Sequence, residues 1–342
     1  MFKPCPLSKA SYLWDLQYKT YSDHGPACWT KLGVPLQISS NAYTAYYFSE
    51  LIKQLRPRTI LEIGAGTGRF TYMLLQLLSR DIEYHMSDIS EKSIIFWKAN
   101  ELLNKRTKMH FYNPLNDQPV CSPDLIIANY VFDAMPQALY RKQNGQLFEG
   151  IANISGGPSI NELKLKWEYQ PCQTHFTYSQ SIDNVAFTYP TSALHLLNLF
   201  PKAAFMIADK GMWTLEQLRE PTFNQHGTFS LPVNFHALVS DFCNPTPGIH
   251  FCRPQQPDPR YSVGIFSKSP LPPIKMIEPD PQSALDQFMA LPSLDSLRKM
   301  HWDPMLYLMI AKHVKLTKAE KAEVDKRFYP LSVDENLVYE WS

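Results

Sequence analysis

The stretch TILEIGAGTGRF, residues 59–70, decides the fold of this chain. Its β-branched and aliphatic residues run to Ile63, alternate glycines follow, and apolar residues then recur at helical spacing from Phe70 to Leu78. Glycine lets a chain reverse with positive φ, and it lets backbone amides approach a ligand without a Cβ between them. The stretch therefore predicts a strand, a tight turn and a helix, in the order of a nucleotide-binding loop.

The residues around the glycines distinguish this loop from its relatives. Arg69 stands where a dinucleotide fingerprint requires its third glycine, and no lysine follows as a phosphate-binding P-loop would require. The acidic Glu62 before the turn does not suit a pyrophosphate. The loop instead resembles the E/D-x-G-x-G-x-G motif of class I methyltransferases that use S-adenosylmethionine (SAM), a ligand with a sulfonium and an ammonium group. That resemblance implies cofactor contacts by Glu62, Gly64, Ala65, Gly66 and Gly68.

A second acidic residue follows at the distance that such a fold requires. The strand-like run IEYHMSD ends at Asp88, twenty residues after Gly68. In βαβ nucleotide-binding folds, an acidic residue about 20 residues beyond the glycines accepts hydrogen bonds from the ribose hydroxyls. We therefore expect Asp88 and the adjoining Ile89 to contact the cofactor. Glu62 alone could be a strand-end carboxylate in water, but together with the glycines and Asp88 it favours a cofactor site.

Composition argues against several classes of protein. The 342 residues carry a formal net charge of +1, so the overall field favours neither nucleic acid nor an anionic membrane surface. Six cysteines lie far apart without a C-x-x-C pair, which argues against a zinc site and a disulfide framework. No run of about 18 apolar residues could span a membrane, and residues 1–6 lack the apolar segment of a secretory signal. We expect a soluble cytoplasmic protein without a metal site.

The pattern along the chain predicts an α/β protein. Residues 1–56 are expected to form a helical N-terminal extension, and residues 57–268 a Rossmann-like SAM-binding domain. The strand at 124–128 is apolar throughout, as is typical of a central parallel strand. The order of the expected strands matches the seven-stranded sheet of class I methyltransferases. Strands are expected at 59–63, 82–88, 108–112, 124–128, 203–208, 249–252 and 262–267, and helices at about 90–103 and 234–243.

Two further segments complete this organisation. Residues 137–200 mix charged and amide residues with alternating runs such as 163–169, and we interpret them as an insertion that acts as a lid. Residues 269–342 begin with a proline-rich linker and continue as a small helical appendage. Its helices are expected near 282–290, 304–313 and 317–328.

A family resemblance appears at the carboxyl end of the fourth strand, where open α/β folds bind their ligands. Residues 127–136, IANYVFDAMP, resemble the Ala-Asn-Glu-x-x-Asp-x-x-Pro segment of the MidA-like methyltransferases. That family includes a mitochondrial complex I assembly factor acting as a protein arginine methyltransferase. Residues 227–238, GTFSLPVNFHAL, are similar to the family's segment that enters the helix after strand five. The resemblance covers roughly residues 35–267.

One position departs from the family pattern, because Tyr130 stands where the family has a glutamate. A guanidinium substrate needs a buried carboxylate for bidentate pairing, and a phenol does not supply that charge. Arginine methylation therefore does not transfer automatically to this chain. The chain looks closer to an uncharacterised bacterial branch that shares Asn-Tyr-Val/Phe-Phe-Asp-x-x-Pro-Gln, an N-terminal Ser-Ser-Asn stretch and the segment Trp302-Asp303-Pro304.

Three side chains are candidates for the acceptor side of the site. Methyl transfer from a sulfonium is an in-line displacement, so the protein must align the acceptor and remove its proton. Asp133 is the candidate base or acceptor anchor, Tyr130 a hydrogen-bonding partner, and His236 a second candidate base. Each has a structural alternative: Asp133 could cap a local helix, Tyr130 could pack in the wall of the site, and His236 could be a core histidine.

Three further residues are expected to contact the cofactor. Asn129 ends the fourth strand, and we expect it at the methionine part. Ser40, beside Ser39, is expected at the cofactor entrance, although capping of the helix that starts near Asn41 is an equal alternative. Asn113 follows the third strand, where methyltransferases place an acidic or amide residue against the adenine amino group.

Together these residues predict a SAM-dependent methyltransferase that releases S-adenosylhomocysteine (SAH). The insertion and the helical appendage favour a protein side chain over a small molecule as the acceptor. Because Tyr130 replaces the family's glutamate, a second function stays open. In that alternative the protein is a degenerate methyltransferase that binds SAM and serves as an assembly or interaction module. The incomplete dinucleotide fingerprint argues against a nicotinamide oxidoreductase.

Overall fold

The computed structural model describes residues 3–31, 39–174, 176–225, 227–243, 250–255, 257–276, 298, 301–304, 307 and 316–331. The chain divides into two compact units, each built from segments that are distant in sequence. The β-rich unit holds residues 1–21 and 113–271, and the glycine-loop unit holds residues 22–112 and 272–342. The domain boundaries expected at residues 56 and 268 remain a proposal.

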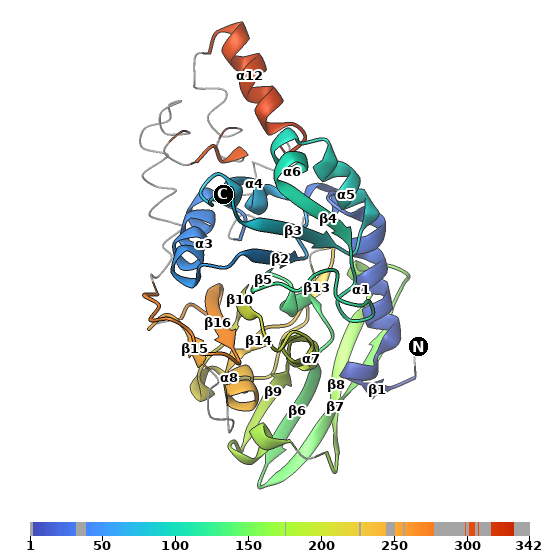
Figure 1. Ribbon diagram of the computed structural model, residues 1–342. Coiled ribbons are helices and arrows are strands. Elements are labelled where there is room, and N and C mark those ends of the chain that lie inside the picture. The colour runs from blue at the N-terminus through green and yellow to red at the C-terminus, as the bar shows by residue number, and fades with distance from the viewer. Residues whose placement is uncertain are drawn as a thin grey trace. The chain divides into compact units, whose positions relative to one another are not determined.

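Three parallel strands form the centre of the glycine-loop unit. β2 (Thr59–Ile63) pairs with β3 (Glu83–Asp88), which pairs with β4 (Thr107–Phe111), and Figure 1 shows the three side by side. The register sets Glu62 opposite Met86. The described helices of this unit are α2 (Ala27–Lys31), α3 (Ala42–Leu55), α4 (Arg69–Leu75), α5 (Glu91–Lys98), α6 (Glu101–Arg106) and α12 (Lys318–Phe328).

Helix α3 begins and packs as its sequence predicts. Asn41 is its N-cap, and the side-chain oxygen of Asn41 accepts a hydrogen bond from the N–H of Thr44 at 2.8 Å. The buried ring of Phe48 lies 4.9 Å from that of Phe70 in α4, in an edge-on arrangement. Burial of each such side chain stabilises the fold by about 1.5–3 kcal/mol.

The β-rich unit holds four further strands of this kind. β5 (Leu125–Asn129) pairs in parallel with β10 (Ala204–Asp209), and β16 (Ser262–Ser267) pairs antiparallel with both β10 and β15 (His250–Cys252). The described strands follow the order β15-β16-β10-β5 in this unit and β2-β3-β4 in the glycine-loop unit. These orders, with an antiparallel strand second from one edge, are those of the class I methyltransferase sheet. The predicted fold class is therefore confirmed.

Residues expected to form an insertion build a second, antiparallel sheet. Among the described strands, β7 (Gln146–Ser155) pairs with β1 (Cys5–Pro6), β6 (Ala138–Gln143) and β8 (Lys164–Pro171), and β6 pairs with β9 (Val185–Tyr189). β8 lies at an edge of this sheet, and its residues alternate between exposed and half-buried as the sequence predicts. The lid function of this segment remains a proposal.

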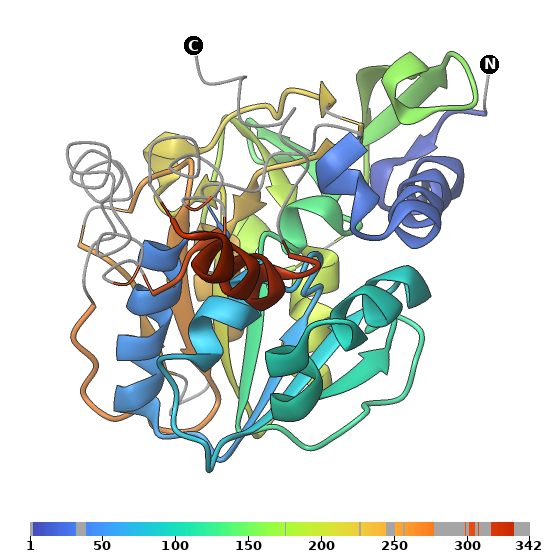
Figure 2. The ribbon, with the colours of Figure 1, turned by 90° about the horizontal axis from the view of Figure 1, so that it is seen from above.

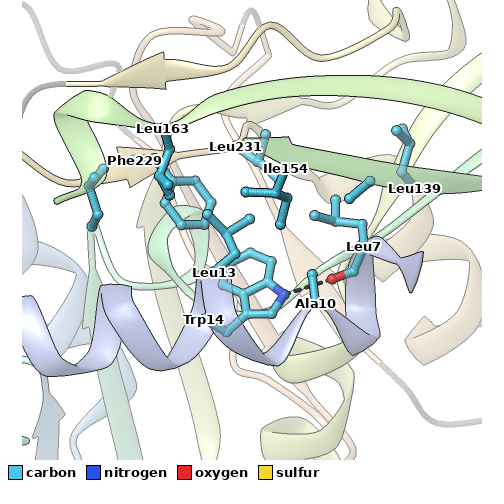
Figure 3. Close-up of a cluster of buried hydrophobic side chains, with 11 residues drawn as sticks. Leu7, Ala10, Leu13, Trp14, Leu139, Ile154, Leu163, Phe229 and Leu231 are labelled. Carbon is cyan, nitrogen blue, oxygen red and sulfur yellow. Dashed lines mark hydrogen bonds between the residues drawn. The ribbon is translucent and has the colours of Figure 1, made fainter. Parts of the chain in front are cut away.

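An apolar core joins the first residues of the chain to this second sheet (Figure 3). Helix α1 (Ser11–His24) supplies Leu13 and Trp14 to it. The ring of Trp14 lies 5.0 Å from that of Phe229, and its Nε1 donates a hydrogen bond to the carbonyl oxygen of Leu7 at 2.8 Å. The cluster consists of Leu7, Ala10, Leu13, Trp14, Leu139, Ala152, Ile154, Ile160, Leu163, Phe229 and Leu231.

The remaining described elements are short. They are α7 (Thr191–Leu199), α8 (Phe235–Cys243), β11 (Gly211–Met212), β12 (Asn224–Gln225), β13 (Phe229–Ser230) and β14 (Val233–Asn234), with the 3₁₀ turns η1 (Leu7–Lys9), η2 (Phe132–Ala134), η3 (Ile160–Glu162), η4 (Thr177–Gln180) and η5 (Leu215–Gln217). In the part of the chain that the structure describes, no helix is long and apolar enough to cross a membrane.

Several helices differ from the sequence-based expectation. α4 ends at Leu75, before the apolar pattern ends, because a turn follows in which the N–H of Leu77 donates to the carbonyl oxygen of Leu74. The helix expected at about 90–103 is divided into α5 and α6 at Asn100, whose side chain caps α6. The last expected helix is confirmed as α12. The helices expected near 282–290 and 304–313 lie outside the described residues, apart from positions 304 and 307.

Candidate functional site

The glycine loop joins β2 to α4 through three left-handed residues. Gly64, Gly66 and Gly68 have φ angles of +68°, +57° and +74°, a region that residues with a side chain rarely adopt. The N–H of Gly68 donates to the carbonyl oxygen of Ala65 at 2.8 Å, and the N–H of Ala65 donates to that of Ser87 in β3 at 3.0 Å. This backbone geometry explains why the motif needs glycine at these positions.

Asp88 lies directly against the loop. Its Oδ2 accepts a hydrogen bond from the N–H of Gly66 at 3.0 Å, and its Oδ1 accepts one from the N–H of Ser90 at 2.9 Å. Burial raises the pKa of this carboxyl to about 6. A carboxylate held in this way keeps lone pairs that can accept from vicinal hydroxyl groups. The structure thus brings Asp88 and the glycines together, while cofactor contacts by Asp88 and Ile89 remain predictions.

Glu62 is buried between elements of the glycine-loop unit. Its Oε2 accepts hydrogen bonds from the hydroxyls of Thr71 in α4 at 2.5 Å and Tyr84 in β3 at 2.8 Å. Burial raises the pKa of Glu62 to about 7, although the two hydroxyl donors oppose that shift. One carboxylate oxygen is therefore used inside the protein, and a cofactor contact by Glu62 remains a prediction.

Sequence reasoning missed two residues of α2 that lie at this loop. The ring of Trp29 covers Gly66, since a Cβ built on Gly66 would lie 2.9 Å from it. Cys28 is fully buried, and burial together with the charge of Asp88 raises the pKa of its thiol to about 12. Because α2 is five residues long, no apolar periodicity marks it in the sequence.

The backbone before α2 is attached to the start of α5. The hydroxyl of Ser90 donates to the carbonyl oxygen of Ser22 at 2.7 Å, and the ammonium of Lys92 donates to that of Asp23. Gly25 has a φ of +52°, and a Cβ there would lie 2.8 Å from the Ser90 hydroxyl oxygen. These contacts hold α2 beside the loop and Asp88.

Ser40 and Asn113 are two further residues that the sequence predicts at the cofactor, and the structure shows the local hydrogen bonds around them. Asn41, and not Ser40, caps α3, so the capping alternative does not apply to Ser40. The side-chain oxygen of Asn113 accepts from the N–H of Leu115 at 3.1 Å, and the N–H of Asn113 donates to Asp117 at 2.7 Å. Cofactor contacts by Ser40 and Asn113 remain predictions.

In the β-rich unit, β5 leads into a strained tyrosine. The side-chain oxygen of Asn129 accepts from the hydroxyl of Tyr261 at 3.1 Å. Tyr130 has a φ of +56°, which costs a bulky residue about 1–3 kcal/mol and marks functional positions in other proteins. Its ring stacks on that of Tyr261 with centroids 5.6 Å apart, and its hydroxyl donates to the carbonyl oxygen of Arg260 at 2.6 Å. Burial and the charge of Asp209 raise the pKa of Tyr130, so this proton stays on the phenol.

Asp133 is buried and lies in a cluster with Lys210 and Ser230, which are half-buried. The ammonium nitrogen of Lys210 lies 3.4 Å from Oδ2 of Asp133 and donates a hydrogen bond to the hydroxyl of Ser230. Burial raises the pKa of Asp133, and the charge of Lys210 opposes that shift. The N-cap of η2 is Val131, so Asp133 does not cap a helix.

Asp209 holds the backbone of this cluster in place. Its Oδ2 accepts from the N–H groups of Phe132 at 3.0 Å and Asp133 at 3.1 Å, and its Oδ1 accepts from the N–H of Lys210 at 2.9 Å. Burial and the charge of Asp133 raise the pKa of Asp209 well above its ordinary value. Sequence reasoning missed both Asp209 and Lys210, although their position at the carboxyl end of β10 is a signal that could have found them.

His236 belongs to a different group of side chains. Its Nδ1 lies 3.0 Å from the hydroxyl of Tyr178, and the side-chain amide of Asn234 donates to the same hydroxyl at 3.4 Å. Burial lowers the pKa of His236, so the neutral imidazole is favoured. No contact described by the structure joins His236 to Asp133, and a catalytic role for His236 remains a prediction.

Five cysteines in the described part of the chain, namely Cys5, Cys28, Cys121, Cys172 and Cys252, form no disulfide. Within the same part, no group of three or more histidine, cysteine or acidic side chains could hold a metal ion.

Comparison with known families identifies the class of protein. Residues 44–223 match the family described as "Putative S-adenosyl-L-methionine-dependent methyltransferase". The match spans more than half of the chain, so the chain belongs to this family. The predicted enzyme class, a methyltransferase, and the predicted cofactor, SAM, are therefore confirmed. The glycine loop fits this cofactor, because Gly64, Gly66 and Gly68 have no Cβ that would keep a ligand from the backbone, and Asp88 supplies a carboxylate beside the loop.

Solved structures show the same fold. An uncharacterized superfamily protein from Burkholderia thailandensis is 16% identical over 73% of this chain and 74% of that one, with a TM-score of 0.50. A superfamily member from the same organism, bound to S-adenosyl-homocysteine, is 15% identical with the same coverage and a TM-score of 0.51. The comparison with curated proteins found no match.

Proposed function

We propose that the chain methylates a protein side chain that loses a proton during the transfer, and that Asp133 is the base. The observation that carries this proposal is the buried carboxylate of Asp133, which lies 3.4 Å from the ammonium of Lys210. A nearby cation favours the ionised carboxylate that a base must present. His236 is the weaker candidate, because it contacts Tyr178 and Asn234 instead.

When bound, SAM supplies an electrophilic methyl group: the lone pair of the acceptor forms the new bond while the carbon–sulfur electrons return to sulfur, which leaves SAH. Asp133 accepts the proton that the acceptor releases, and Lys210 and Ser230 keep its carboxylate oriented. The hydroxyl of Tyr130 serves as a hydrogen-bond acceptor for the substrate, because its hydrogen is already used in the hydrogen bond to the carbonyl oxygen of Arg260.

The cofactor contacts proposed for this chain are those that the sequence predicts, together with Trp29, which the structure adds. Asp88 accepts from the ribose, Glu62 uses its second oxygen, and Trp29 shields the loop. The other proposed contacts are Gly64, Ala65, Gly66, Gly68, Ile89, Asn113, Asn129 and Ser40.

The charges of the β-rich unit disfavour an arginine acceptor. The carboxylate of Asp133 is matched by Lys210, that of Asp209 is used by three backbone N–H groups, and Tyr130 is uncharged. A guanidinium would therefore find no free carboxylate pair among these residues. We propose an acceptor that is uncharged or anionic after it loses its proton.

The second sheet supports a protein acceptor. Strand β8 lies at its edge and exposes four polar side chains, namely those of Lys164, Lys166, Glu168 and Gln170. An edge strand presents unpaired backbone groups, to which an extended peptide can add as a further strand. This surface suits a polypeptide better than a small molecule.

The acceptor class is tested by incubating the protein with methyl-labelled SAM and fractionated lysate. We expect label in a protein fraction. Label that enters only small molecules or nucleic acid would overturn the protein acceptor. SAH binding without label in any fraction would instead support the degenerate binding module.

The base is tested with Asp133→Asn. We expect the turnover rate to fall about 10²–10⁴-fold, because general-base catalysis contributes that much, while SAH affinity stays unchanged. Asp183→Asn is the matched control, since the carboxylate of Asp183 is exposed and accepts only from backbone N–H groups in the described contacts. Unchanged turnover in Asp133→Asn would remove Asp133 from the mechanism.

A further inference from the structure

Strand β8 forms an edge of the second sheet. Its residues, Lys164–Pro171, pair with β7, and among the strands that the structure describes no other pairs with them. An edge strand presents a row of backbone N–H and C=O groups, and natural proteins protect or cover such a row. The side chains of β8 therefore indicate which partner suits this edge.

One face of β8 carries large apolar side chains. Leu165, Trp167 and Tyr169 are half-buried and pack against the apolar cluster that α1 shares with this sheet. Figures 1 and 2 show α1, in blue, beside the green strands of the sheet. Because the three side chains are only half-buried, apolar surface stays exposed along the strand, and its burial would favour association.

The other face of β8 carries charges of both signs. Its exposed side chains are those of Lys164, Lys166, Glu168 and Gln170. None of the ion pairs formed among the described residues involves Lys166 or Glu168. Lysines on an edge strand commonly protect it against pairing with another chain. The glutamate two residues after Lys166 changes this outcome, because a strand with both signs can match a strand that runs the opposite way.

The charge pattern of β8 is complementary to itself. In an antiparallel pair of two β8 strands centred on Trp167, Lys166 of each copy lies opposite Glu168 of the other. Directly opposite residues have Cβ atoms about 4.5–5.5 Å apart, which is close enough for an ion pair. Lys164 lies opposite the uncharged Gln170, so no like charges meet. Moving the centre by two residues would set Lys166 opposite Lys166, or Glu168 opposite Glu168, and like charges directly opposite each other are destabilising.

The apolar face and the ends of β8 favour the same centre. Leu165 would lie opposite Tyr169 of the second copy, and Trp167 opposite its own copy. Such apolar and aromatic pairs across two strands stabilise a sheet. Leu163 already donates its N–H within a turn, and Pro171 has no N–H to donate. The residues between these two are the ones that can pair, and Trp167 is their midpoint.

We propose that two copies of this chain associate through β8, antiparallel and centred on Trp167, so that the second sheet continues across a two-fold axis. The contact is isologous, because the same strand of both copies forms each half of the interface. Backbone hydrogen bonds between the two strands supply affinity, and the paired side chains select the register. An acceptor strand would add to the same edge, so an acceptor that binds there displaces the second copy.

Analytical ultracentrifugation over a range of protein concentrations tests this interface. We expect the wild-type chain to form a dimer. Lys166→Glu and Glu168→Lys should each weaken the association at least about tenfold, because each sets like charges opposite each other at two positions of the interface. Lys164→Glu is the matched control, since it makes the same change of charge on the same face but lies opposite the uncharged Gln170. The control should therefore remain a dimer.

A mixture of the two charge-reversed variants separates loss of the interface from misfolding. Lys166→Glu carries only negative charge at positions 166 and 168, and Glu168→Lys only positive charge, so one copy of each restores two opposite-charge contacts. We expect the equimolar mixture to form a heterodimer with about wild-type affinity.

Three outcomes would overturn the interface through β8. They are a wild-type chain that stays monomeric, a single charge-reversed variant that dimerises with wild-type affinity, and a mixture of the two variants that stays monomeric. Association does not depend on methyl transfer, so each of these outcomes leaves the proposed acceptor class and the role of Asp133 to their own experiments.

Discussion

The carboxylate of Glu62 is held by two hydroxyl groups from different elements, Thr71 of α4 and Tyr84 of β3. The motif predicts an acid at this position but not these partners. The described contacts involve Oε2 alone, so the second carboxylate oxygen of Glu62 is the one that we propose for the cofactor. Burial of the charged Glu62 carboxylate costs free energy of folding, and the two hydrogen bonds offset part of that cost.

The first prediction concerns the stability of Glu62→Gln. The pKa of Glu62 is about 7 in the folded protein against an ordinary 4.5, so the folded state binds the proton more tightly. The free energy of unfolding therefore falls as the pH rises from about 4.5 to about 7. Glutamine accepts the same hydrogen bonds without a charge. We expect Glu62→Gln to be more stable than wild type by about 1–3 kcal/mol above pH 8.

Urea denaturation at two pH values measures this difference. The advantage of Glu62→Gln should shrink toward zero as the pH falls below 4.5, where the wild-type carboxyl becomes protonated in both states. Glu168→Gln, on the exposed face of β8, is the control for the substitution itself. An equal advantage at both pH values would show that Glu62 is not a buried titrating group.

Sequence reasoning succeeded for residues whose role follows from local order. Asp88 was predicted because it ends the strand after the glycine loop, and parallel neighbours bring such ends together. Lys210 was missed because its partners, Asp133 and Ser230, are distant in sequence and meet only in the folded unit. Charge pairs of this kind carry no spacing that a single sequence reveals.

At the scale of elements, the short helix α2 is the clearest addition. It places Trp29 over Gly66 and Cys28 near Asp88, although it has no periodic pattern of its own. Longer elements were predictable, because the apolar run of β5 and the apolar face of α3 reflect burial along their whole length. A five-residue helix is defined by its tertiary neighbours instead.

The position of α2 predicts a spectroscopic signal. SAH bound at the loop should change the environment of Trp29, so tryptophan fluorescence should change during an SAH titration. Trp29→Phe should lose most of that change, whereas Trp167→Phe, a half-buried tryptophan of β8, should retain it. A full signal in Trp29→Phe would show that another tryptophan, such as Trp97 beside Gly68, reports the binding.

At the scale of the whole molecule, the chain leaves the glycine-loop unit at residue 112 and returns to it at residue 272. The helix that follows the cofactor loop is therefore contacted by a segment from the last part of the sequence, through Arg327 of α12 and Leu331. Any ligand that binds only the folded loop must stabilise this arrangement by mass action.

This linkage gives a prediction for ligand-dependent stability. SAH at one hundred times its dissociation constant should raise the free energy of unfolding by about 2.7 kcal/mol. Asp88→Ala should abolish the effect, since it removes the proposed ribose acceptor. NAD at the same concentration should have no effect, because the dinucleotide fingerprint is incomplete. Stabilisation by NAD in place of SAH would contradict the cofactor assignment, and denaturation curves with each ligand decide it.

The sequence by itself determined the cofactor class and the order of the main sheet. Local backbone geometry and burial determine the glycine spacing, the acidic residue at position 88 and the apolar runs. These features can therefore be recognised in the sequence alone. Only the tertiary structure decided what surrounds the loop: Trp29 over Gly66, and the carbonyl oxygen of Leu331 at the side chain of Arg69. Those contacts join residues far apart in sequence, and long-range packing leaves no periodic signal in either partner. The loop thus identifies the methyl donor, while the fold reveals what holds it in place.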